Sequence, residues 1–162
     1  MKISAVLVLI LAFSSGSILA QEGGPPAGSV LPLGPGCTNI PLSIAGNTPV
    51  PGGTFTVSGV GPPGVQGGLF ASLSENTGGG PGPFVIQGGP GFSDLCTLHL
   101  NPFASSLVSP IIPDGNANWS FSTPVITVPM GVTVEIDLQA LFFHPATGLL
   151  VSDGLRVTPP SL

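Results

Sequence analysis

The sequence predicts an all-β fold, an antiparallel two-sheet sandwich of immunoglobulin-like architecture with about seven to nine short strands. The hydrophobic residues, 42% of the chain, fall into short runs separated by turns rich in Gly and Pro. Helices have little support, because hardly any window is free of Gly or Pro and the chain has only two Lys and Arg residues in all. A parallel sheet would need helices between its strands, and none is readable.

Residues 1–20 have the pattern of a secretory signal peptide that is cut after Ala20. Lys2 gives a short positive start, Ile3 to Phe13 form an apolar run, and small residues lead up to Ala20. The apolar run is shorter than the roughly 20 residues of a membrane-spanning helix, and no other stretch comes close. We therefore expect an exported protein, either secreted or held in the cell envelope (extracellular or periplasmic), with no membrane span after signal cleavage.

The rest of the chain divides at Cys37. Residues 21–36, QEGGPPAGSVLPLGPG, show no period and predict a flexible lead-in. Residues 37–162 form the predicted β-sandwich domain, because they contain short runs bounded by turn residues. These runs are residues 37–44, 53–60, 68–74, 83–87, 96–100, 106–112, 118–122, 132–143 and 149–158.

Residues 132–143 form the clearest predicted strand, because apolar residues alternate with Thr133, Glu135, Asp137 and Gln139. Such alternation predicts one face on the core and one in solvent. Paired carboxylates on one strand face can bind calcium or act as acid and base in glycoside hydrolysis. No D-x-D-x-D-type loop supplies further oxygen ligands for calcium, so we prefer a solvated face that discourages aggregation.

Cys37 and Cys96 are the only cysteines of the chain. In an exported protein an even pair predicts a disulfide bond. Metal ligation and a redox pair fit less well, since there is no C-x-x-C spacing and no adjacent pair of His residues. The predicted disulfide joins the first strand of the domain to a strand near the middle of the chain.

After removal of the leader, one Arg stands against seven Asp and Glu residues, a formal charge of −6. A chain so poor in cations cannot neutralise phosphates. Nucleic acid and anionic membrane surfaces are therefore poor candidate partners. The expected partner is an unknown protein or glycan of the cell envelope.

The single Arg of the mature chain, Arg156, lies in the last predicted strand. If the last two runs pair without interruption around the turn HPATG, Arg156 falls opposite Ile136 on the apolar face, where an unpaired charge is costly. One extra residue at Asp153–Gly154, a β-bulge, moves Arg156 opposite Asp137. We therefore predict a structural ion pair between Arg156 and Asp137, exposed to solvent and contributing about 0.2–1 kcal/mol.

The remaining candidate residues are His99, His144 and Trp119. His99 alternates with Leu98 and Leu100 and is expected to point to solvent, whereas His144 begins a turn. Trp119 is in phase with Phe121, which predicts a place in the core. No nucleophile elbow of the G-x-S-x-G type is present, and no His lies beside an acid in a recognisable pattern.

The stretch GVGPPG, Gly59 to Gly64, matches the G-x-G-x-x-G pattern of dinucleotide sites. Pro62 and Pro63 remove two of the backbone donors that such a site needs, and no helix follows. The stretch predicts a turn. We expect no cofactor, no metal and no catalytic residue.

The C-terminal segment, LQALFFHPATGLLVSDGLRVT, resembles a domain common in secreted proteins of planctomycete bacteria, whose members typically end in a Q-A…D-P…G…S-N-G-L-R-V-T pattern. His144 stands where Asp is usual and Asp153 where Asn is usual. The resemblance extends from about Gly36 to the C-terminus, and it implies export and a small β domain but no activity. The matching residues are Gln139, Ala140, Pro145, Gly148, Ser152, Gly154, Leu155, Arg156, Val157 and Thr158.

Two functions remain open on these observations. The first is an exported, non-enzymatic structural or interaction module. The second is a carbohydrate-binding module or weak hydrolase that uses Glu135, Asp137, His99 or Trp119. A buried Trp119 favours the first function, and an exposed aromatic patch beside a groove favours the second.

Overall fold

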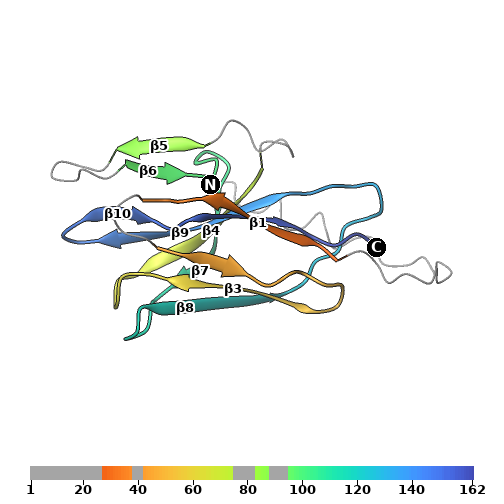
Figure 1. Ribbon diagram of the computed structural model, residues 1–162, viewed down its shortest axis with the longest axis horizontal. Helices are drawn as coiled ribbons and strands as arrows, with labels where there is room; N and C mark the ends of the chain where they lie inside the picture. Colours follow the sequence, from red (N-terminus) through yellow and green to blue (C-terminus); the bar gives the residue numbers. More distant parts are fainter. Residues whose placement is uncertain (1–26, 38–41, 75–82, 88–94) are drawn as a thin grey trace, which may run out of the picture.

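The computed structural model describes residues 27–37, 42–74, 83–87 and 95–162, and every regular element in these ranges is a β-strand (Figure 1). The predicted all-β class is confirmed, and the described residues form eleven strands in antiparallel sheets, a few more than expected. Within the same ranges no helix is long and apolar enough to cross a membrane. The predicted signal peptide and its cleavage site lie outside the described residues.

The strands in the described part of the chain form three sheets. The largest has the order β1 (Ser29–Gly34), β11 (Gly154–Thr158), β9 (Ile136–His144), β4 (Gly67–Leu73) and β7 (Ser106–Ile111), and β10 (Gly148–Val151) also pairs with β9. The second sheet has the order β2 (Ile44–Gly46), β3 (Thr54–Val60) and β8 (Asn118–Pro124). The third is the pair β5 (Phe84–Gln87) and β6 (Leu95–Leu98).

The extra strands have two origins. Residues 29–34, which the sequence places in a flexible lead-in, form β1 along the edge of the largest sheet, where they pair with β11. The last predicted run divides into β10 and β11. The strand predicted for residues 132–143 also starts later than expected, since β9 begins at Ile136.

The main core lies between the six-stranded and the three-stranded sheets (Figure 1). Along β9, Leu138, Ala140 and Phe142 belong to this core and are at most 7% exposed. The three-stranded sheet contributes Val57 and Trp119 from β3 and β8. Burial of this apolar surface is the main driving force for joining the two sheets.

A second, smaller core covers the opposite face of the six-stranded sheet, under β5 and β6 (Figure 1). Leu98, Leu100 and Val151 are at most 5% exposed in it. Asp137 and Gln139 lie on this side of β9 and are buried, so the predicted solvated strand face is wrong. The alternation of polar and apolar residues correctly predicted which residues share a face of β9. It could not predict that a distant segment of the chain covers the polar face.

Candidate functional site

Arg156 lies opposite Asp137 in the antiparallel pair of β11 and β9. Its guanidinium donates two hydrogen bonds to the carboxylate, from Nε to Oδ1 at 2.7 Å and from Nη2 to Oδ2 at 3.0 Å. Nη1 lies 3.4 Å from Oε2 of Glu135. The Ser74 hydroxyl donates to the same Oε2 at 2.8 Å. This arrangement, the Arg156 cluster, consists of Arg156, Asp137, Glu135 and Ser74.

The register of β11 depends on a bulge. Val151 pairs with Leu141, and Leu155 pairs with Leu138, so four steps along one strand match three steps along the other. The backbone of Ser152 still donates to the Ala140 carbonyl at 2.9 Å. The extra residue therefore falls at Asp153–Gly154, and the register beyond it is the one that brings Arg156 to Asp137.

The Arg156 cluster is much less exposed than the sequence suggests. The side chains of Arg156 and Asp137 are 17% and 5% exposed. The chain after β6 crosses this face of the sheet, where the backbone of Asn101 donates to the Ser72 hydroxyl, and Ser72 is the β4 partner of Asp137. Losing one partner of a bidentate ion pair under such a cover is costly, because the other charge stays largely buried.

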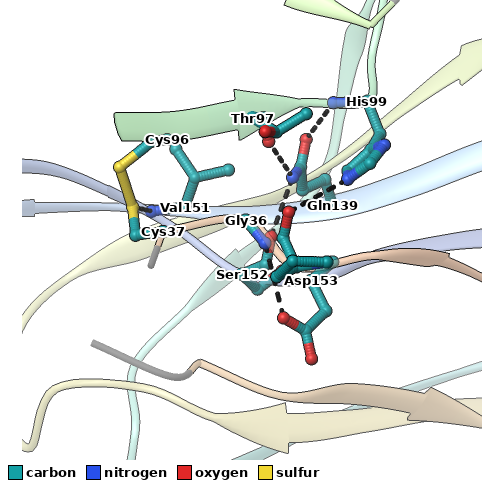
Figure 2. The surroundings of a disulfide bond; sticks show 10 residues. Gly36, Cys37, Cys96, Thr97, His99, Gln139, Val151, Ser152 and Asp153 are labelled. Atoms are coloured by element: carbon teal, nitrogen blue, oxygen red, sulfur yellow. Dashed lines mark hydrogen bonds between the residues drawn. A yellow bond between two sulfur atoms is a disulfide. The ribbon is translucent and has the colours of Figure 1, made fainter. Parts of the chain in front are cut away.

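Gln139 connects three segments of the chain (Figure 2). Its Nε2 donates to the carbonyl oxygens of Thr97 at 2.9 Å and Ser152 at 2.8 Å, and its Oε1 accepts from the backbone of His99 at 2.9 Å. The residue is 0% exposed. This role could not be predicted, because the alternation of polar and apolar residues assigned Gln139 to solvent with the other polar residues of the strand.

The predicted disulfide between Cys37 and Cys96 is confirmed, with an S–S distance of 2.06 Å (Figure 2). Each cysteine is 4% exposed. The backbone of Cys37 donates to the Val151 carbonyl, and the backbone of Val151 donates to the Cys37 sulfur, both at 3.2 Å. The disulfide therefore joins β6 to the segment after β1, and the two hydrogen bonds join that segment to β10.

We expected His99 to point into solvent. In the structure it is half-buried, and its ring covers Gly154. A Cβ atom at Gly154 would lie 2.6 Å from Cδ2 of that ring, which explains a glycine at the bulge. The ring's Nε2 is 3.2 Å from the Pro35 carbonyl oxygen. Beside it, Oδ1 of Asp153 accepts a long hydrogen bond of 3.4 Å from the backbone of Gly36.

His144 and Trp119 also serve the fold. Nδ1 of His144 accepts from the backbone of Ala146 and Thr147, both at 3.2 Å, and so stabilises the turn between β9 and β10. Trp119 is 6% exposed, in the main core as predicted.

The Arg156 cluster, Gln139 and the two cysteines thus link segments of the fold to one another. Among the described residues, no group of three or more His, Cys, Asp or Glu could hold a metal ion. The chain matches no protein-family model, and neither a curated protein nor a solved structure shows detectable similarity to it.

Proposed function

We propose that this chain is an exported, non-enzymatic structural or interaction module whose two larger sheets form an immunoglobulin-like sandwich. The observation that carries the proposal is that the charged, amide and thiol side chains connect strands of the fold to one another. Arg156, Asp137 and Gln139 are held by short hydrogen bonds between strands, and both cysteines are joined in a disulfide. Groups held in this way serve to join the strands, and the disulfide helps to make a small domain durable outside the cell.

Export is supported by the disulfide, which forms and persists in oxidising compartments, and by the leader pattern of residues 1–20. The test is to fractionate the native host and measure the intact mass of the protein in each fraction. We expect it in the medium or the envelope, with Gln21 as its first residue and the disulfide formed. Recovery from the cytosol with Met1 retained would overturn the proposal.

The alternative function, a carbohydrate-binding module or weak hydrolase, is less well supported. Trp119 is buried in the main core and has no face to offer a sugar ring. Asp137 is engaged by Arg156, and Glu135 by Arg156 and Ser74. The partner remains an envelope protein or glycan, and cross-linking on intact cells followed by mass spectrometry distinguishes the two.

The absence of catalysis is testable with single substitutions. His99→Ala, His144→Ala and Glu135→Gln should each leave the biological role unchanged wherever the protein still folds. Circular dichroism and thermal unfolding identify the folded variants. A folded variant that loses a turnover measurable in the unsubstituted protein would refute the non-enzymatic assignment.

A further inference from the structure

A cavity of about 270 Å³ lies between the two larger sheets, and it is partly open to solvent. Phe55 and Val57 of β3 line one side, and Leu69 of β4 and Leu138 of β9 line the other. Ile126, which follows β8, also lines it and is 48% exposed. The cavity is thus bounded by both sheets near the start of β3 and the end of β8.

The walls of the cavity are almost wholly apolar. Among the described residues that line it, Thr123 is the one with a polar side chain, and its hydroxyl donates to the Pro124 carbonyl at 3.5 Å. A water molecule in a protein interior needs two to four polar partners, and these walls do not supply them. An apolar molecule, by contrast, would exchange contact with water for contact with close-packed side chains.

The charges of the chain restrict the ligand further. Lys2 and Arg156 are its only Lys and Arg residues. Arg156 is paired with Asp137, on the opposite side of β11 from Val157, which lines the cavity. Among the residues that the structure describes, no Asp or Glu lines the cavity either. An anionic or cationic ligand head placed inside the cavity would therefore lose its hydration without gaining a partner of opposite charge.

We propose that this cavity is a binding site for a small, uncharged aliphatic molecule. Since a water molecule takes about 30 Å³ in the liquid and a methylene group is of similar size, a volume of about 270 Å³ holds roughly nine non-hydrogen atoms. That is the size of a medium-chain alcohol or hydrocarbon and is smaller than a membrane lipid. This binding site goes beyond the proposed structural or interaction function and does not depend on it.

The test is a titration of the ¹⁵N-labelled protein with 1-hexanol, 1-octanol and 1-decanol, followed by NMR. We expect saturable shifts at Val57, Ala71 and Leu138. The affinity should rise about fourfold per added methylene up to 1-octanol and then level off, because further methylenes extend beyond the cavity. Octanoate and octylammonium at neutral pH should bind at least tenfold more weakly than 1-octanol.

The matched variants are Ala71→Leu, which adds three carbon atoms to the cavity wall, and Ala45→Leu, which adds the same atoms at an exposed position of β2. Ala71→Leu should lose at least nine tenths of the affinity, and Ala45→Leu should keep it. If Ala71→Leu does not fold, nuclear Overhauser contacts between 1-octanol and the methyl groups of Val57 and Leu138 in the unsubstituted protein decide the question. Shifts that do not saturate, that spread to exposed Phe103 and Phe143, or that are equal for charged ligands would overturn the proposal.

Discussion

At the scale of single residues, the covered face of β9 presents a physical problem. A charge or an amide buried without partners costs several kcal/mol, so each polar group there must find its full set of hydrogen bonds. Asp137 meets this requirement with the guanidinium of Arg156, and Gln139 meets it with backbone groups of β6 and of the bulge. Both residues therefore favour the placement in which β11 and β6 lie next to this face of β9, because these segments supply their hydrogen-bond partners.

Asp137→Ala should destabilise the protein by about 3 kcal/mol, because it leaves the Arg156 guanidinium largely buried without its bidentate partner. This exceeds the value of under about 1 kcal/mol that an exposed pair would give. Urea denaturation measures the difference. The double variant Asp137→Leu/Arg156→Met should recover much of the loss, since it removes both charges. An Asp137→Ala protein as stable as the unsubstituted one would show that the pair contributes nothing.

Gln139→Leu should also cost about 3 kcal/mol, because the Thr97 and Ser152 carbonyls and the His99 amide lose their partner together. The matched control is Gln66→Leu, which makes the same change at an exposed position. The two free energies of unfolding, measured side by side in urea, should differ by at least about 2 kcal/mol. Equal values would mean that these hydrogen bonds are replaced by water at no cost.

At the scale of elements, the pair β5–β6 depends on a few specific links to the six-stranded sheet. An isolated two-stranded unit is at best marginally stable in water. The disulfide, the Gln139 hydrogen bonds and the small second core provide those links. The bulge at Asp153–Gly154 belongs to the same region, since His99 from the segment after β6 packs directly on Gly154.

Cys37→Ala/Cys96→Ala should lower the free energy of unfolding by about 4 kcal/mol, as expected when a cross-link between residues 59 positions apart is lost. The loss should be uneven across the molecule. Hydrogen exchange should show loss of protection in β5 and β6 first, while β3 and β8 stay protected. If all four strands lost protection together, β5–β6 would have to be an integral part of one cooperative unit.

Gly154→Ala should destabilise the protein by about 1–3 kcal/mol, because the new methyl group overlaps the His99 ring. His99→Ala removes that ring, so the double variant Gly154→Ala/His99→Ala should be more stable than the sum of the two single losses predicts. A double-mutant cycle by thermal unfolding measures this coupling. Additive losses would show that His99 moves aside without cost.

At the scale of the whole molecule, local rules predicted a large part of the structure. Turn residues and alternation located most strands, the cysteine count predicted the disulfide, and counting residues along the last hairpin pointed to a bulge at Asp153–Gly154. β1 escaped prediction because Pro32 and the surrounding glycines weaken a strand pattern, although an edge strand tolerates proline. The burial of Asp137 and Gln139 was missed because it depends on a segment about 40 residues distant in sequence, as in the bond from His99 to Gln139.

The position of Arg156 has a consequence for proteolysis. Trypsin cleaves after Lys or Arg, and after residue 20 the sequence offers it a single bond, between Arg156 and Val157. That bond lies inside β11, which pairs with β1 on one side and β9 on the other, so a protease reaches it only after β11 leaves the sheet. Folded protein should resist trypsin, and the release of residues 157–162 should follow the population of open molecules as urea is added. The chain thus contains its own one-site reporter of unfolding, readable by mass spectrometry without any label.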